Sequence, residues 1–185
     1  SKKTLHSYGE NNTLLMSHAS HYVPGIKFST GSLGHGLPVA IGSALSAKKD
    51  KNNRKVFVLI SDGELNEGTT WEALMFAAHH KLNNLCVIID YNKLQSLTFV
   101  SETIKIEPLI KKISSFGCEV KNINGHNILQ LKKALKLKNK NKPRVIIANT
   151  IKGKGVSFME NNIAWHYKSP NARELKKALK EVNNA

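Results

Sequence analysis

Acidic residues are scarce in this chain, and so are cysteines and long apolar runs. Two cysteines, Cys86 and Cys118, are too few to staple a fold of 185 residues, which excludes a secreted disulfide scaffold. The longest apolar runs, Val56–Ile60 and Leu85–Ile89, are strand-sized and far short of a bilayer span. No positively charged start leads into an apolar stretch, so we expect no signal peptide. We therefore expect a cytoplasmic protein without a membrane partner.

Aromatic residues are also few, at 6%, and this bears on a net charge of +15, which comes from 28 basic and 13 acidic residues. Two basic clusters, at 132–142 and 173–180, contain no aromatic side chain to stack on bases. The spacing of Leu131, Ala134 and Leu135 between lysines is typical of an amphipathic helix with a solvated face. The pattern predicts no nucleic-acid partner, and anionic small molecules stay candidate ligands.

What the chain does contain is an alternation of strands and helices. The composition, 41% hydrophobic and 22% charged, is that of a globular domain. Buried strands are predicted at Val56–Ile60, Leu85–Asp90 and Val145–Ala148, with a weaker edge strand at Cys118–Ile123. Helices are predicted at Gly36–Lys48, about Asn66–Leu82, Pro108–Phe116, Ile128–Lys138 and Asn171–Val182. This order predicts a single α/β domain over residues 1–185, a three-layer open parallel sheet with helices on both faces.

Two polar turns follow the first two predicted strands. Asp62 and Gly63 come after the first strand, and Asn92 comes after the second. Both turns should lie at the carboxyl edge of a parallel sheet, where such sheets bind ligands. A carboxylate and an amide oxygen are ligands suited to Mg²⁺ beside phosphate oxygens. Each turn alone is explained as a structural turn, but the pair together predicts a metal and phosphate site.

A glycine-rich stretch and a basic pair supply further candidates. Residues 29–37 read STGSLGHGL, a loop that can present backbone N–H groups to a ligand, although a tight structural turn also explains it. Lys152 follows the third buried strand, and His166 lies farther along. Both are expected to reach the same sheet edge. His18 and His21 lie in a loop, and their spacing predicts no zinc site.

Three stretches together resemble one enzyme family. These are STGSLGHGLPVAIGSAL, then SDGELNEGTTWEALMFAAHHKLNNLCVIIDYNKLQS, then KGKGVSFMEN followed by Trp165-His166. They resemble the thiamine-diphosphate-binding half of transketolase, and most of all the separately encoded N-terminal subunit of split transketolases. The likeness runs from about His18 to His166 in the family's order. Ser61 stands where the family usually has glycine.

The resemblance implies a role for each matching residue. It implies that Mg²⁺, or Ca²⁺ or Mn²⁺ in its place, is held by Asp62, Asn92 and the carbonyl of Leu94. It implies cofactor contacts from Gly31, Leu33, Asp62, Gly63, Glu64, Asn92, Ile151 and His166. It implies catalytic or substrate-side roles for His18, Lys152 and His166, and communication across a subunit interface for Glu67.

The resemblance also implies the assembly and the reaction. The pyrimidine-binding domain, with the glutamate that activates the cofactor, would be a separate chain, and two copies of each would form a heterotetramer. The reaction would move a two-carbon ketol unit between sugar phosphates or nucleotide-linked sugars, whose identity the sequence does not predict. An N-terminal helical stretch of the family is expected to be missing. The alternatives are a noncatalytic paralogue acting as a scaffold, a deoxyxylulose-phosphate-synthase-like enzyme, or a two-oxoacid dehydrogenase component.

Overall fold

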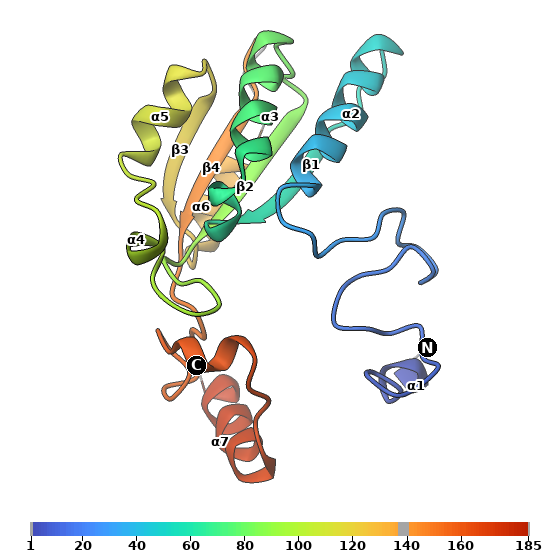
Figure 1. Cartoon of the computed structure of the whole chain (residues 1–185), viewed down its shortest axis with the longest axis vertical. Coiled ribbons are helices and arrows are strands. Elements are labelled where there is room, and N and C mark those ends of the chain that lie inside the picture. Colours follow the sequence, from blue (N-terminus) through green and yellow to red (C-terminus); the bar gives the residue numbers. More distant parts are fainter. Residues whose placement is uncertain (1, 137–140, 185) are drawn as a thin grey trace.

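The computed structural model describes residues 2–136 and 141–184, which form one four-stranded sheet in the order β1-β2-β4-β3 (Figure 1). All neighbouring strands are parallel. The strands are β1 (Val56–Ser61), β2 (Leu85–Tyr91), β3 (Glu119–Asn124) and β4 (Arg144–Asn149). All four predicted strands are therefore confirmed, and the weak one, β3, does lie at an edge.

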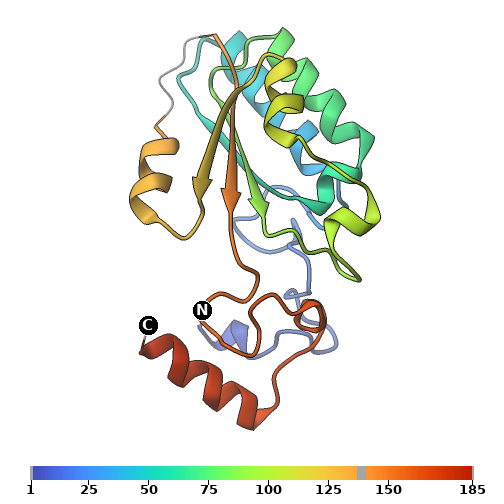
Figure 2. The same cartoon turned by 90° about the vertical axis from the view of Figure 1, so that its left-hand side faces the viewer.

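Helices cover the sheet unequally on its two faces (Figure 2). The larger layer consists of α2 (Gly36–Lys49), α3 (Gly68–His79) and α5 (Leu109–Ser115). On the opposite face lies α6 (Ile128–Ala134), which packs against β3. The remaining elements are α1 (Lys2–Leu5), α4 (Val100–Thr103), α7 (Ala172–Asn183) and the 3₁₀ turns η1 (Gly63–Asn66) and η2 (Ile163–His166). The predicted three-layer α/β architecture is confirmed.

Two predicted helices differ from those observed. The helix expected from about Asn66 to Leu82 is interrupted, because Glu67 is extended, with φ −84° and ψ 125°, and separates η1 from α3. The helix expected over Ile128–Lys138 ends at Ala134, and Lys138 lies outside the described residues.

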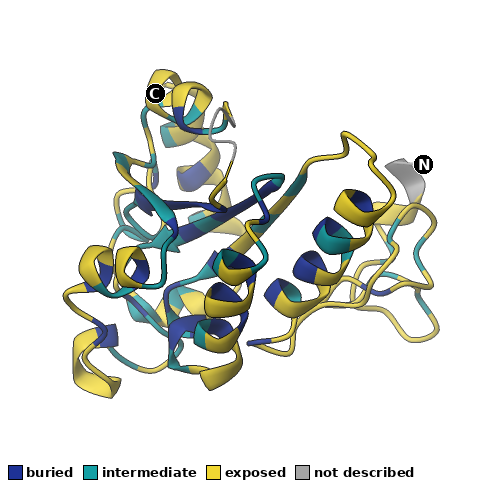
Figure 3. Cartoon of the chain, turned by 90° about the horizontal axis from the view of Figure 1, so that it is seen from above, coloured by how far each residue is buried: buried dark blue, intermediate teal, exposed yellow. Residues whose placement is uncertain are grey.

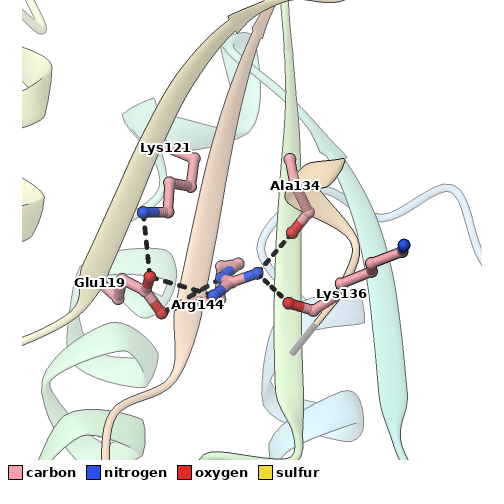
Figure 4. Close-up of polar contacts among 5 residues, drawn as sticks. All are labelled: Glu119, Lys121, Ala134, Lys136 and Arg144. Carbon is pink, nitrogen blue, oxygen red and sulfur yellow. Dashed lines mark hydrogen bonds and ion pairs between the residues drawn. The ribbon is translucent and has the colours of Figure 1, made fainter. Parts of the chain in front are cut away.

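The end of α6 is fixed by Arg144, the first residue of β4 (Figure 4). Its Nη1 donates to the carbonyls of Ala134 and Lys136 at 2.7 and 2.6 Å. Its Nη2 donates to both carboxylate oxygens of Glu119 on β3, at 3.0 and 2.9 Å. A cation at a helix C-terminus complements the helix dipole. Arg144 thereby joins β3, β4 and α6 in one buried contact.

The core explains why the central strands are continuously apolar. β2 and β4 are covered on both faces, and Val87, Ile89, Val145 and Ile147 are buried in the main cluster (Figure 3). The edge strand β1 instead alternates, with Phe57 and Leu59 exposed by 49% and 69%. These two residues pair in register with Cys86 and Ile88, which pack toward α6. The helix α6 covers the sheet beside β3 and β4 and leaves this part of β1 uncovered.

The strands point their carboxyl ends toward the segment 150–184 (Figures 1 and 2). This segment carries η2 and ends in α7, which Glu181 ties to the backbone N–H and hydroxyl of Ser157 at 2.5 and 2.9 Å. The N-terminal segment before α2 lies at the same end of the molecule and is mostly exposed. Across the described residues, no helix has both the length and the apolarity to cross a membrane.

Candidate functional site

The first two polar turns meet at the carboxyl edge of the sheet. β1 and β2 are in parallel register, with Ser61 opposite Asp90. The next backbone N–H along, that of Asp62, donates to the Asp90 carbonyl at 3.2 Å. The backbone N–H of Lys93 donates to Oδ2 of Asp62 at 2.5 Å, which brings the turn after β2 directly against the turn after β1. The predicted juxtaposition of Asp62 with the turn at Asn92 is therefore observed.

Asp62 is the most unusual ionisable group at this edge. Its residue is 1% exposed, and its second carboxylate oxygen, Oδ1, is buried without a hydrogen-bond partner. Burial raises the pKa of this carboxyl to about 6, Asp90 adds to the rise, and the backbone N–H groups of Lys93 and Gly63 oppose it. Buried polar atoms are rarely left unpaired in folded proteins. The orphaned oxygen therefore fits a cation ligand.

The turn at Asn92 adds neutral oxygens beside this carboxylate. The Oδ1 of Asn92 accepts the Leu94 N–H at 2.9 Å and keeps a second lone pair for another partner. Between them, Lys93 has a φ of 68°, in the left-handed region, and this bend lets its N–H reach Asp62. Leu94 is 5% exposed. The described residues hold no group of three or more His, Cys, Asp or Glu that could bind a metal, so a cation here would need amide and carbonyl oxygens.

The glycine-rich loop packs against the loop that carries His18. Gly31 has a φ of +123°, and a Cβ built on it would lie 2.4 Å from Cδ2 of His18. The Thr30 N–H also donates to the Ala19 carbonyl at 2.9 Å. A side chain at position 31 would therefore displace the imidazole. The structure brings these two predicted residues together.

The same loop is tied to η1 through Glu64. The Gly34 N–H donates to Oε1 of Glu64 at 3.0 Å, and Glu64 is 8% exposed. The hydroxyl of Thr69 donates to the Gly34 carbonyl at 2.9 Å. Glu64 thus has a structural contact, and its predicted contact with a cofactor stays a prediction. Glu67 is exposed at the start of α3.

A cavity of about 590 Å³ lies beside this loop. Its lining includes Gly31, Leu33 and Glu64, three of the residues predicted to contact a cofactor. The uncovered apolar residues of β1, Phe57 and Leu59, also line it. The cavity therefore joins the glycine-rich loop to the bare face of the first strand.

Lys152 and His166 form a pair on the segment beyond β4. The Nζ of Lys152 lies 3.2 Å from Nδ1 of His166. Partial burial, with the positive charge of Lys152, lowers the pKa of His166. A neutral imidazole that accepts from Lys152 at Nδ1 carries its proton on Nε2. The pair therefore presents an ammonium and an N–H donor to an anionic or hydroxylated ligand.

Backbone contacts connect this pair to the other groups. The Thr150 N–H donates to the Tyr91 carbonyl at 3.2 Å, so the segment leaves the sheet directly beside the turn at Asn92. The next N–H, that of Ile151, donates to Nε2 of His126 at 2.8 Å. Sequence reasoning missed two contributors at this edge, Lys93 and His126. The glycine–histidine pair directly after the third strand in sequence was a usable signal for His126.

Comparison with known proteins agrees with this geometry. The family described as transketolase, thiamine diphosphate binding domain, matches residues 3–183. A subunit of the apulose-4-phosphate transketolase of Actinobacillus succinogenes is 44% identical over 97% of this chain. The 6-deoxy-6-sulfo-D-fructose transketolase subunit SqwG of Clostridium sp. is 39% identical over 92% of it. The chain spans 66% and 63% of the lengths of these two relatives.

A solved structure shows the same arrangement of elements. The transketolase of Campylobacter jejuni superposes on 99% of this chain with a TM-score of 0.93 and 30% identity, and the match covers 30% of that longer chain. Sequence family and fold thus agree over nearly every residue. The chain belongs to the transketolase family, as a member of its thiamine diphosphate-binding domain.

Proposed function

We propose that this chain is the thiamine-diphosphate-binding subunit of a two-subunit transketolase. The observation that carries the proposal is the buried Asp62 carboxylate, whose orphaned oxygen lies beside Asn92 at the ligand-binding edge of the sheet. The assembled enzyme would move a two-carbon ketol unit between sugars. Relatives named as transketolase subunits support this reaction class.

The metal would be held by one charged and two neutral oxygens. We assign these to Oδ1 of Asp62, Oδ1 of Asn92 and the carbonyl of Leu94, an all-oxygen set suited to Mg²⁺, with Ca²⁺ or Mn²⁺ as substitutes. Gly63, the first residue of η1, would let a diphosphate approach the backbone. When bound, thiamine diphosphate supplies the carbon nucleophile of the reaction, and the chain supplies its anchoring.

The substrate side would be formed by basic residues. Lys152 would bind an anionic substituent, and Nε2 of His166 would donate to a substrate or diphosphate oxygen because its Nδ1 faces Lys152. His18 would reach the substrate from its place over Gly31. The relatives named above act on a phosphorylated and a sulfonated sugar by their names, which supports a sugar with an anionic group. Sugar phosphates and nucleotide-linked sugars both meet this requirement.

The partner would be a chain with the pyrimidine-binding domain. Two relatives are named as single subunits of apulose-4-phosphate transketolases, which supports a second chain, and we propose two copies of each in a heterotetramer. Glu67 is exposed at the start of α3 and would communicate across that interface. The two cysteines are free and buried, which supports a cytoplasmic site of action.

The test combines the purified chain with its partner subunit. Calorimetry with thiamine diphosphate and Mg²⁺ should show tight binding only for the mixture, and a coupled assay should show ketol transfer only there. Asp62→Ala should abolish metal-dependent binding, while Asp50→Ala, at the exposed end of α2, should not. Activity of the chain alone, or undiminished binding by the Asp62 variant, contradicts the proposal. Binding without ketol transfer by the mixture would favour the noncatalytic scaffold.

A further inference from the structure

His126 lies outside every motif that pointed to the site, yet it contacts the site's backbone. It follows β3 by two residues and precedes Asn127, the N-cap of α6. Its Nε2 accepts the Ile151 N–H at 2.8 Å. Because Nε2 is the acceptor, the ring proton of neutral His126 is on Nδ1. The side chain thus links the β3–α6 loop to the segment that leaves β4.

The approach of these two loops is built into the sheet edge. The Gly125 N–H donates to the Asn149 carbonyl at 2.8 Å, and a Cβ at Gly125 would lie 2.5 Å from Cγ2 of Thr150. The side-chain amide of Asn149 donates to Oδ1 of Asn122 and to the Ile123 carbonyl, at 2.6 and 2.9 Å. A glycine is therefore needed at position 125, and His126 is held against residue 151 by its own backbone.

The bond to Ile151 comes at the point where the chain leaves the sheet. The preceding N–H, of Thr150, is still bonded to the neighbouring strand β2. The following residue, Lys152, accepts the Asn161 N–H at its carbonyl, at 3.0 Å, and faces His166 with its side chain. His126 therefore fixes the one backbone N–H between the sheet and the Lys152 turn.

We propose that His126 is a positioning residue for Ile151 and Lys152, which it holds at the carboxyl edge through a single acceptor nitrogen. This inference rests on the proposed function only in giving Ile151 and Lys152 their roles toward cofactor and substrate. His126 itself touches neither. The acceptor at Nε2, and not the ring as such, is what the position requires.

The variants are chosen to separate the acceptor from the side-chain volume. A glutamine at this position places its terminal amide near the location of Nε2, whereas an asparagine reaches only to the location of Nδ1. His126→Gln should therefore keep the bond, and His126→Asn and His126→Leu should lose it. His79, exposed at the end of α3, serves as the control in His79→Leu.

The experiment uses the assembled two-subunit complex. A lost neutral hydrogen bond is worth about 0.5–1.5 kcal/mol, which converts to about 2–10-fold. His126→Leu and His126→Asn should weaken thiamine diphosphate binding or raise the KM for the donor sugar by that factor, and speed amide hydrogen exchange at Ile151 similarly. His126→Gln and His79→Leu should stay within about twofold of the parent.

Nitrogen NMR of the parent should show His126 protonated at Nδ1. Parental exchange at Ile151 in the leucine variant, or a glutamine variant as impaired as the leucine variant, overturns the inference. Exchange and tautomer are read without catalysis, so an inactive parent complex would refute the proposed function and leave this test intact.

Discussion

Replacing Asp62 with asparagine should stabilise the metal-free chain while removing its metal site. The carboxylate is 1% exposed with one oxygen unpartnered, and its pKa rises from 3.8 to about 6 on folding. A difference of about 2 pKa units corresponds to about 3 kcal/mol. The folded chain binds this proton more tightly than the unfolded chain. Stability is therefore highest below pH 4 with respect to this group and falls as the pH rises to about 6.

Asparagine removes the charge at every pH. Its carbonyl oxygen can still accept the Lys93 N–H, but its amide nitrogen takes the unpartnered place of Oδ1, at a cost of about 1–2 kcal/mol. The net gain in unfolding free energy at pH 7.5 should be about 1–2 kcal/mol. Below pH 4, where Asp62 is protonated in both states, that advantage should vanish.

The assay is urea denaturation of the purified chain with a chelator at several pH values between 4 and 8. Asp50→Asn, on an exposed residue, should shift the unfolding free energy by less than about 0.5 kcal/mol and is the matched control. Calorimetry should show that the Asp62 variant no longer binds Mg²⁺ with thiamine diphosphate in the assembled complex. An Asp62→Asn chain less stable than the parent at pH 7.5, or equally dependent on pH, would refute the reasoning.

Two further substitutions test the frame and the glycine-rich loop. Arg144→Met leaves the Glu119 carboxylate and two carbonyls without their donor, and should lower the unfolding free energy by about 3 kcal/mol in urea denaturation, with part of the loss recovered when Glu119→Met is added; full additivity of the two would contradict the pairing. Gly31→Ala should displace the ring of His18 and reduce ketol transfer by the complex more than Gly25→Ala does, since Gly25 also has a positive φ, of +94°, but nothing within 4 Å of its Cβ position; equal losses would show that backbone strain alone matters.

Local pattern was sufficient for the elements whose neighbours are adjacent in sequence. The runs at 56–60 and 85–90 became β1 and β2 because unbroken β-branched and aliphatic residues suit strands in a covered sheet. The helix predicted from Asn66 was wrong at its start because Glu64 accepts from Gly34, across the fold, and this contact favours the tight η1 turn. Helical periodicity carries no information about such a distant partner.

The sequence by itself determined the order of strands along the chain, the family, and the placement of Asp62 and Asn92 at one edge, because parallel strands joined by right-handed crossovers must share their carboxyl edge. Tertiary structure alone decided which oxygen of Asp62 is orphaned, which donor meets the other, and that His126 meets Ile151. These contacts depend on the path of loops whose ends are fixed by separate strands. Their distances follow from packing of residues far apart in sequence, which no local spacing encodes.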